Sequence, residues 1–269
     1  MKKMVIIGAG AMGSAFAVPC EENKNDVTIV GTHLEDNLIE NIRSNNHFHP
    51  TLKTQLSKEI KFKKFEELHN ILSRDLDIIV CGVSSVGVEW FVKQISKNYK
   101  KKLPLVLLTK GLSILDNELI TLSEKIKILL KKEGHLEVNI SAIKGPCIAA
   151  GLANKMRTGT VIANQNIKES QLLKEIISTN YYSAEISEDI TGVELSGAIK
   201  NIYSMIIGAS EGLSNAKASK EIKSKYFLNT AASLIHRSIS EMVEFVSNYG
   251  GNSETVYGLA GLGDLYVSA

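Results

Sequence analysis

The chain opens with a short apolar run that leads directly into three glycines with the spacing G-x-G-x-x-G. The run is Met4–Ile7, and Gly8, Gly10 and Gly13 follow it. In this pattern the first glycine permits a tight turn, the second lets the backbone approach a pyrophosphate, and the third lets helix and strand pack closely. The helix that follows would present unpaired N–H groups and a positive dipole end to phosphates. Because the motif joins a strand to a helix, it predicts a dinucleotide-binding turn rather than an ordinary tight turn.

Short runs rich in β-branched residues alternate with amphipathic segments over the first two-thirds of the chain. This alternation is typical of βαβ units on a parallel sheet. The segments 86–99 and 117–134 have the three- and four-residue apolar spacing of helices. The expected strands lie in KMVIIGAG, DVTIVGT, LDIIVCGV, LPLVLLTKG, VNISAIKG, TGTVIAN and YYSAEISED.

The pattern changes after Asp189, where two long helical stretches follow each other without a strand between them. They cover residues 191–213 and 225–250. The sequence therefore predicts an α/β protein in which an N-terminal Rossmann-type parallel-sheet domain precedes an all-helical C-terminal domain. We expect the dinucleotide-binding domain to cover residues 1–188 and the helical substrate domain to cover residues 189–269.

The composition argues against several classes of protein. A hydrophobic content of 44% with 22% charged residues is that of a globular protein, and the net charge of +2 gives a nucleic-acid partner no support. No apolar stretch approaches the roughly 20 residues of a membrane span, and no signal peptide is visible, so we expect a cytoplasmic protein. Free buried thiols are expected, with neither disulfide nor metal site, because no C-x-x-C pair occurs among Cys20, Cys81 and Cys147.

In this fold, the residues at the end of the second strand determine whether NAD or NADP is preferred. An acidic residue there would bind the ribose 2′-hydroxyl of NAD. The sequence instead has Gly31, Thr32 and His33 at this point. Thr32 and His33 are able to hydrogen-bond a 2′-phosphate, while we expect Glu35 and Asp36 to cap the next helix. The choice between the two cofactors stays open.

Three lysines occupy positions at which a ligand would lie. Lys110 and Lys144 follow strands, at the carboxyl edge where doubly wound sheets bind ligands, and the alternative for each is a solvated loop lysine. Lys200 lies within an apolar helix, where burial would lower its pKa toward the range useful for proton transfer. Ser196 and Gly197 lie about one turn earlier on the same face, and we expect these small residues to leave a pocket within reach of Lys200.

Six segments together resemble the NAD(P)-dependent glycerol-3-phosphate dehydrogenases over essentially the whole chain. In order, they are GAGAMGSAFA, LLTKGL, GPCIAAGLA, VELSGAIKNIYSM, NTAASLIHRSISEM and YGLAGLGDL. That family reduces dihydroxyacetone phosphate to sn-glycerol 3-phosphate, which supplies glycerophospholipid synthesis. The resemblance implies the same reversible hydride transfer, NAD or NADP as cofactor, a small-molecule substrate, and a protein able to form a homodimer.

The resemblance also implies roles for individual residues. Lys200 resembles the general acid/base that protonates the substrate carbonyl, Lys110 the lysine that contacts substrate beside the nicotinamide, and Asp264 the acidic residue that helps to hold the site. Asn201, in the same motif as Lys200, is a secondary catalytic candidate. The implied substrate contacts are Lys110, Gly145, Lys200 and Asp264. The implied cofactor contacts are Gly8, Gly10, Ala11, Met12, Gly13, Thr32, His33, Ser84, Lys110 and Ala149.

Three features depart from the family's pattern. Gly151 stands where members often have a glutamate, and Lys144 stands where they usually have a serine. The chain ends at Ala269, before the Arg-Asn segment with which the family grips the substrate phosphate. We therefore expect the helical substrate domain to be incomplete, either because the chain is a fragment or because the protein is truncated, and we expect weak turnover.

Two alternative functions follow from these departures. A nucleotide-binding protein without turnover would keep the dinucleotide fold and lack a complete substrate site. A related β-hydroxyacid dehydrogenase would also combine a Rossmann domain, a helical domain and a catalytic lysine, but the segment YGLAGLGDL argues against it. Arg237 offers no substitute phosphate anchor, because we expect it to form a structural ion pair with Glu241, four residues on in a helix.

Overall fold

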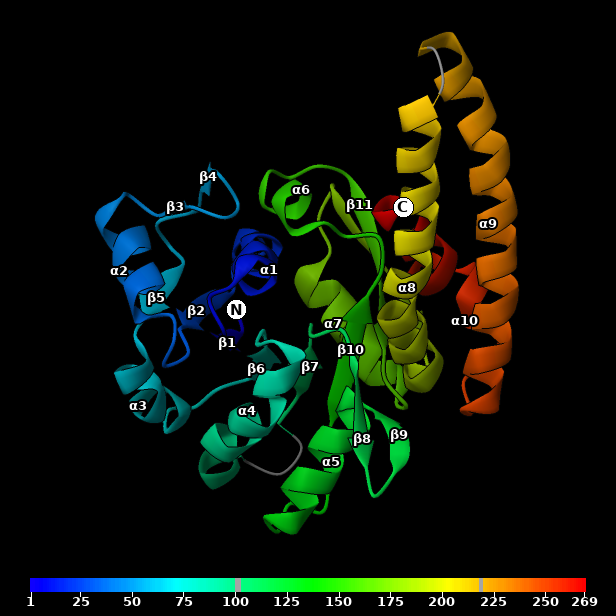
Figure 1. The fold of residues 1–269 in the computed structure, drawn as a ribbon. Helices are drawn as coiled ribbons and strands as arrows, with labels where there is room; N and C mark the ends of the chain where they lie inside the picture. The colour runs from blue at the N-terminus through cyan, green and yellow to red at the C-terminus, as the bar shows by residue number, and fades with distance from the viewer. Residues whose placement is uncertain (100–102, 218–219) are drawn as a thin grey trace.

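One large sheet and a pair of long helices beside it dominate the structure (Figure 1). The computed structural model describes the backbone of residues 1–99, 103–217 and 220–269, and the side chains of these ranges apart from 214–226. No helix in these ranges is both long enough and apolar enough to cross a bilayer.

The main sheet has eight strands in the order β12-β11-β10-β7-β6-β1-β2-β5. The bounds are β1 Lys3–Ile7, β2 Asp26–Val30, β5 Lys61–Lys63, β6 Ile78–Cys81, β7 Leu105–Leu107, β10 Ile140–Lys144, β11 Thr158–Ala163 and β12 Tyr182–Ser187. All seven expected strands form, and β5 is an additional short one. The six strands from β10 to β5 are parallel, as predicted, but β11 runs antiparallel to β10 and β12 runs parallel to β11.

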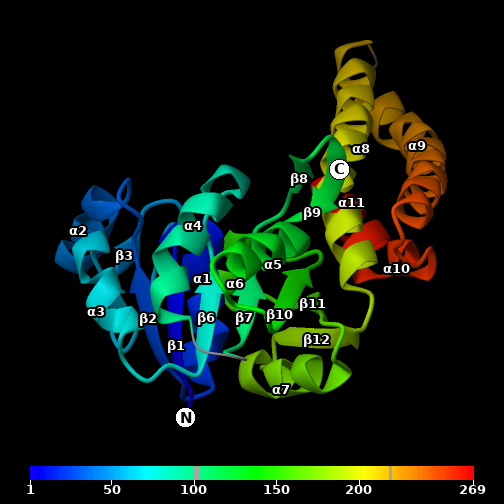
Figure 2. The ribbon, with the colours of Figure 1, turned by 90° about the horizontal axis from the view of Figure 1, so that it is seen from below.

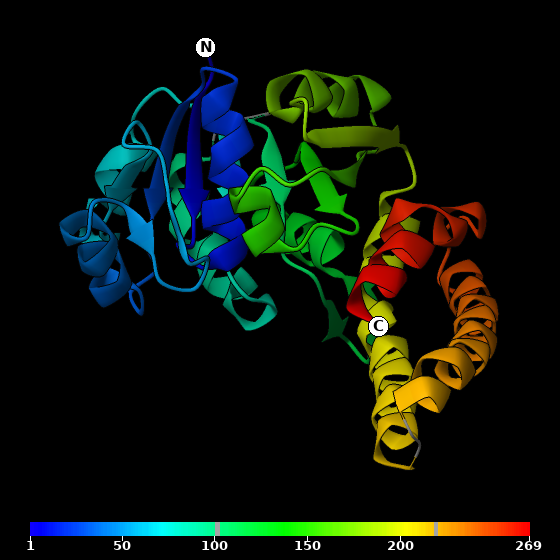
Figure 3. The same ribbon diagram turned by 90° about the horizontal axis from the view of Figure 1, so that it is seen from above.

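Helices cover both faces of this sheet, which explains why the central strands are almost continuously apolar. One face carries α1 (Ala11–Glu22), α2 (Asp36–Ser44), α6 (Ala149–Ala153) and α7 (Ile167–Ile177). The other face carries α3 (Leu68–Leu72), α4 (Val88–Ile95) and α5 (Leu122–Lys132). Figure 2 shows α4 and α5 over their face, and Figure 3 shows α1 and α6 over the opposite one.

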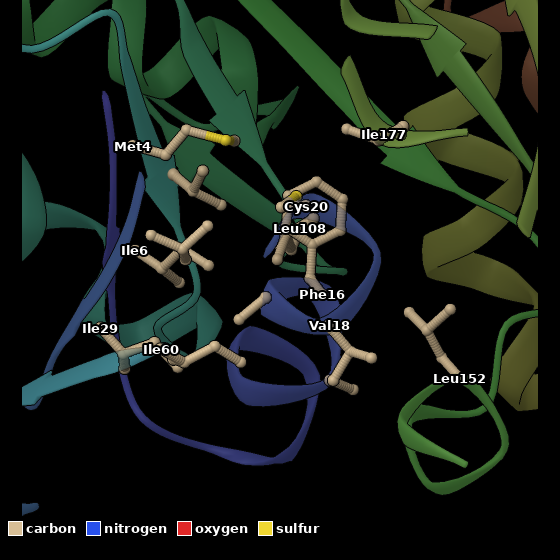
Figure 4. Packing of buried hydrophobic residues seen from close by; sticks show 14 of the residues in the cluster. Met4, Ile6, Phe16, Val18, Cys20, Ile29, Ile60, Leu108, Leu152 and Ile177 are labelled. Atoms are coloured by element: carbon tan, nitrogen blue, oxygen red, sulfur yellow. The ribbon is translucent and has the colours of Figure 1, made fainter. Parts of the chain in front are cut away.

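The core between α1 and the sheet is built from small and large side chains in alternation. Phe16 and Cys20 of α1 are fully buried and lie near Met4 and Leu108 of the sheet side (Figure 4). A Cβ at Gly13 would overlap the carbonyl oxygen of Gly8, so a glycine is needed there for the close approach of α1. Gly13 therefore lets the N-terminus of α1 lie close to the end of β1.

The segment predicted as one helix over 117–134 begins instead as a strand. β9 (Glu118–Thr121) pairs antiparallel with β8 (Leu112–Leu115), and α5 starts only after it. Asp116 and Asn117 between the two strands both have positive φ, 50° and 64°, as a two-residue hairpin turn requires. The predicted helix forms over Leu122–Lys132 but begins later than expected, because the Asp-Asn pair is a turn signal that apolar spacing does not register. A second small hairpin joins β3 (Phe48–His49) and β4 (Thr54–Gln55).

After β12 the described chain is helical, and both long helices predicted from the sequence form. They are α8 (Ile190–Lys217) and α9 (Lys220–Asn248), which lie side by side and are followed by α10 (Glu254–Tyr257), a π-type turn (Leu259–Gly263) and α11 (Asp264–Ser268). The domain boundary predicted near residue 188 falls between β12 and α8. The α/β fold with a helical C-terminal region is thus confirmed.

Asp189 links the start of α8 to the residues that follow α9. Its Oδ1 accepts a hydrogen bond from the Gly192 N–H (2.8 Å), and its Oδ2 accepts from the Asn252 N–H (2.9 Å) and the Thr255 hydroxyl (2.6 Å). One carboxylate therefore caps α8 and anchors the turn that follows α9.

Candidate active site

The three glycines of the turn have different surroundings. Gly8 has φ +110°, and a Cβ there would lie 2.7 Å from the carbonyl carbon of Gly82, so both backbone conformation and space demand glycine. Gly10 has an ordinary φ of −63°, and its Cβ position has no atom nearer than Glu35 Oε1 at 3.8 Å. Gly8 and Gly13 are therefore needed by the fold, whereas Gly10 keeps the space above the turn open.

The N-terminus of α1 fits the pyrophosphate of a dinucleotide. Gly10 occupies the N-cap position, no side chain caps the helix, and its first turn contains no acidic residue. Ala11 and Met12 begin the helix and are partly exposed. Their N–H groups and the helix dipole would stabilise phosphate oxygens placed over Gly10.

The peptide group of Ala9, in the middle of the turn, is fixed on both sides. Its N–H donates to Glu35 Oε2 (3.1 Å), and its carbonyl oxygen accepts from the Ser14 hydroxyl (3.0 Å) and lies 3.1 Å from His49 Nε2. His49 Nδ1 accepts the Leu52 N–H (3.2 Å), so Nε2 carries the proton that bonds to Ala9. Burial lowers the pKa of His49, which keeps the ring neutral in this role. Sequence reasoning missed His49 because nothing local connects it to a turn 40 residues earlier.

The expectation that Glu35 and Asp36 cap the following helix was wrong. No side chain caps α2. Glu35 Oε2 instead accepts the N–H groups of Ala9 and Thr32, and Asp36 Oδ1 accepts the Phe65 N–H (3.1 Å). Both carboxylates leave their own helix because neighbouring loops present unpaired backbone donors to them.

Thr32 and His33, at the end of β2, have different environments. The Thr32 N–H donates to Glu35 Oε2 (2.8 Å). The His33 ring lies against two aromatic rings, with centroids 5.5 Å from Trp90 and 6.1 Å from Phe65. Their roles in cofactor binding stay predictions.

A cavity of about 400 Å³ extends along the carboxyl ends of the central strands. It connects the first turn of α1 with Lys110, which follows β7. Three of the predicted cofactor contacts line it, and a fourth, Ala149, packs against the same core from α6. Its lining includes Met12, Ser84, Thr109 and Lys110.

Lys110, which lines this cavity, belongs to a cluster with Asp264 and Lys200. Asp264 is 1% exposed; its Oδ1 accepts a hydrogen bond from Lys200 Nζ (2.6 Å), and its Oδ2 accepts one from Lys110 Nζ. Lys200 Nζ also donates to the Asp264 carbonyl oxygen (3.2 Å) and contacts the Ser268 hydroxyl. Side chains from the loop after β7, from α8 and from α11 thus form one cluster.

This cluster has a net positive charge in a largely desolvated place. The lysine ammonium groups share one carboxylate, so one positive charge is left uncompensated when all three groups are ionised. Burial lowers the pKa of Lys200, the Asp264 hydrogen bond opposes that change, and the charge of Lys110 adds to the lowering. The Lys110 side chain keeps 32% of its surface exposed, whereas that of Lys200 keeps 6%. An anionic ligand in the cavity would therefore meet Lys110 first.

The π-type turn before α11 delivers Asp264 to this cluster. A Cβ at Gly261 would overlap the Val256 carbonyl oxygen, so the chain can fold back here only with glycine. A Cβ at Gly263 would lie 3.5 Å from the Pro146 ring, in ordinary contact with the turn after β10. The glycine spacing of GLAGLGDL is thus explained by the close passage of the backbone just before Asp264.

Lys144 is not a solvated loop lysine but lies 2% exposed at the end of β10. Its Nζ donates to the carbonyl oxygens of Leu107 (3.2 Å) and Thr109 (2.9 Å). Burial lowers its pKa to about 8, against the opposing charge of Glu194. The space that Gly197 was expected to leave for Lys200 is occupied instead by Lys144, whose Cδ lies 3.3 Å from the glycine's Cβ position.

Glu194 is a second buried charge that sequence reasoning missed. It is 1% exposed on α8 and accepts hydrogen bonds from the Ser123 N–H (3.1 Å) and the Ser123 hydroxyl. Burial raises its pKa, while the charge of Lys144 opposes that. The sequence feature that could have indicated it is a glutamate within an otherwise apolar helical stretch. The nearby Ser196 hydroxyl is buried and has no hydrogen-bond partner among the described residues.

The remaining predicted residues are less closely associated with the cluster. Gly145 has φ +138°, and its carbonyl oxygen lies 3.5 Å from Lys110 Nζ. Asn201 is exposed, and none of the contacts described joins its side chain to the cluster. The expected ion pair between Arg237 and Glu241 forms, with 2.9 Å between Nε and Oε1.

The three cysteines are free, as predicted. Cys20 and Cys81 are buried and Cys147 is partly buried. Burial raises the pKa of Cys81 and of Cys147 to about 11, so neither is a reactive thiolate at neutral pH.

Comparison with known proteins gives matches over nearly the whole chain. The sequence models described as the N-terminus and the C-terminus of NAD-dependent glycerol-3-phosphate dehydrogenase match residues 3–170 and 189–269. The NADP(+)-dependent glycerol-3-phosphate dehydrogenase of Archaeoglobus fulgidus is 35% identical over 263 residues, which are 98% of this chain and 75% of that protein. A glycerol-3-phosphate dehydrogenase [NAD(P)+] of Clostridium botulinum is 27% identical over all of this chain and 74% of its own length.

Solved structures agree with the sequence matches. The crystal structure of glycerol-3-phosphate dehydrogenase from Coxiella burnetii superposes with a TM-score of 0.81 at 25% identity, over 99% of this chain and 75% of that one. The resemblance stated from the sequence motifs is confirmed, and the β-hydroxyacid dehydrogenase alternative is set aside. The two models match the segments that contain the glycine turn and the lysine–aspartate cluster. The chain therefore belongs to the NAD-dependent glycerol-3-phosphate dehydrogenase family.

Proposed function

We propose that this chain reduces dihydroxyacetone phosphate to sn-glycerol 3-phosphate with NADH or NADPH. The observation that carries the proposal is the cluster of Lys110, Asp264 and Lys200, which reaches through Lys110 the cavity that Met12 of α1 also lines. When bound, the reduced nicotinamide supplies the hydride. The chain's own residues must then hold the substrate carbonyl and provide one proton to its oxygen.

Lys200 is the proposed proton donor. It is buried, its pKa is lowered by that burial, and Asp264 fixes its ammonium group through a 2.6 Å hydrogen bond. A lysine with a lowered pKa releases its proton more readily to a developing alkoxide than an exposed lysine does. Asp264 is the proposed orienting residue, because it contacts both lysines and keeps their ammonium groups at a set separation.

Lys110 is the proposed substrate contact. Its partly exposed ammonium group lines the cavity and adds to the positive charge of the cluster. Dihydroxyacetone phosphate carries nearly two negative charges at neutral pH, so this field favours it over uncharged carbonyl compounds. Gly145, beside Lys110 Nζ, allows the chain to turn without a side chain at that point.

The test is to follow reduced-cofactor absorbance in the purified chain with dihydroxyacetone phosphate. We expect cofactor oxidation that depends on this substrate and is absent with unphosphorylated dihydroxyacetone. The expectation of weak turnover stays a prediction, so the assay is run over a range of enzyme concentrations. Cofactor binding without oxidation at any enzyme concentration would contradict the proposal and support the alternative of a nucleotide-binding protein.

We also propose that the protein works in the cytoplasm and forms a homodimer. Free buried thiols suit a reducing compartment. Ile202, Met205 and Ile206 lie on one face of α8 and are 58%, 69% and 46% exposed, which is typical of a surface that another protein covers. Sedimentation equilibrium should give twice the chain's 29.4 kDa, and a purely monomeric species would refute the dimer.

A further inference from the structure

The residues that directly follow β2 are not acidic, but the side chain of Glu35 brings a carboxylate to the end of this strand. It follows Thr32 by three residues and turns back over the glycine turn. Its Oε2 is held by the N–H groups of Ala9 (3.1 Å) and Thr32 (2.8 Å). The side chain is therefore fixed by two donors that belong to the turn and to the strand end.

The other oxygen of this carboxylate is available to a ligand. Within the described part of the chain, the hydrogen bonds of the Glu35 side chain all go to Oε2, and none involves Oε1. This oxygen lies 3.8 Å from the position of a Cβ on Gly10, and so borders the open space above the turn. An acceptor oxygen at this point would contact the part of the cofactor that lies next to the pyrophosphate, on the side of β2.

In dinucleotide-binding folds that part of the cofactor is the adenosine ribose. A carboxylate at the end of the second strand accepts a hydrogen bond from the 2′-hydroxyl of NAD. The same carboxylate would face the 2′-phosphate of NADP, and like charges placed together weaken binding. The chemistry of Glu35 therefore separates the two cofactors.

The lysines at the end of the neighbouring strand already have carboxylate partners. β5 pairs with β2 and ends at Lys63, which donates to Glu67 (2.8 Å), and the next residue, Lys64, pairs with Glu40. His33 also turns its ring toward Trp90 and Phe65, as described above. A 2′-phosphate at the end of β2 would thus meet Glu35 beside lysines that already have carboxylate partners.

We infer that Glu35 makes this chain select NAD(H) over NADP(H), in contrast to the NADP(+)-dependent relative from Archaeoglobus fulgidus. The inference rests on the proposed use of a nicotinamide cofactor and adds which of the two cofactors, NAD(H) or NADP(H), the chain prefers. It concerns binding of the adenosine half, so it is independent of whether dihydroxyacetone phosphate is turned over.

The experiment compares binding of NADH and NADPH by fluorescence titration, and of 5′-ADP and 2′,5′-ADP by calorimetry. The wild-type protein should bind NADH at least about tenfold more tightly than NADPH. Glu35→Gln keeps an oxygen for the Ala9 and Thr32 donors and removes the charge, so the preference should shrink by about tenfold. Glu21→Gln, the same change at the far end of α1, is the matched control and should leave the preference unaltered.

Two further measurements make the outcome decisive. The wild-type preference should narrow at high salt, because the repulsion between carboxylate and phosphate is screened. Glu35→Ser tests the same point if Glu35→Gln lowers the melting temperature. Equal affinities in the wild type, or an unchanged ratio in folded Glu35 variants, would overturn the inference while leaving the proposed reaction intact. A retained preference without turnover would overturn only the proposed reaction, and failure to bind either cofactor would overturn both.

Discussion

Lys200→Ala should lower kcat for dihydroxyacetone phosphate reduction by about 10²–10⁴-fold, the usual loss when a positioned acid is removed. Its affinity for the cofactor should be nearly unchanged, because Lys200 lies on α8 and none of its described contacts involves the glycine turn. The fold should also survive, since Asp264 keeps Lys110 as an ionic partner in the variant. Steady-state kinetics together with cofactor titration would measure both effects.

The pH dependence provides a second readout of the same residue. In the reduction direction the donor must be protonated, so kcat should fall as the pH rises through the pKa of Lys200. Because burial lowers that pKa from the ordinary 10.5, the fall should begin at a lower pH than for an exposed lysine. Lys168→Ala, a change at an exposed position on α7, serves as the control. A Lys200→Ala variant that retains most of its kcat would show that the acid lies elsewhere, with Lys110 the next candidate.

Gly10→Val should weaken binding of the reduced cofactor by about 10- to 100-fold and leave the free protein's stability almost unchanged. The added side chain enters space that the pyrophosphate would occupy, and overpacking of this kind costs about 1–3 kcal/mol. In the free protein a Cβ at this position meets nothing nearer than 3.8 Å, and the φ of −63° suits any residue. Fluorescence titration and thermal melting of the same samples would separate the two effects.

Two other glycines provide the comparison. Gly13→Ala should lower the melting temperature, because its Cβ would overlap the Gly8 carbonyl oxygen. Gly208→Val, in α8 with no atom within 4 Å of its Cβ position, should change neither binding nor the glycine turn. If Gly10→Val binds the cofactor as tightly as the wild type, the pyrophosphate does not lie over this turn.

Local patterns were sufficient to predict the glycine turn and the two long helices, because each depends on neighbours a few residues apart. The cluster of Lys110, Lys200 and Asp264 was predicted only through the resemblance to a family. The partners are 64 and 154 residues apart, and no pattern within the segments records that α11 returns to α8.

The capping role expected of Glu35 and the solvated-loop alternative for Lys144 failed because the partners of these side chains come from another part of the chain. Glu35 stands at a helix start, where a capping role follows from position alone, but backbone donors of the glycine turn lie within its reach. Lys144 stands before a glycine at a strand end, and its ammonium group bonds to carbonyl groups in and just after β7, 37 and 35 residues earlier. Such contacts are set by tertiary packing, which periodicity does not describe.

The contact between Lys144 and Gly197 couples the effects of substitutions at these two positions. A methyl group at 197 would lie 3.3 Å from Lys144 Cδ, so the buried lysine must shift before any larger residue enters there. The reverse change, from Lys144 to the serine usual in the family, would leave an unfilled volume over Gly197 and two carbonyl groups without their donor. The free energies of unfolding of the two single variants should therefore not add up to that of the double variant, as expected for side chains in direct contact.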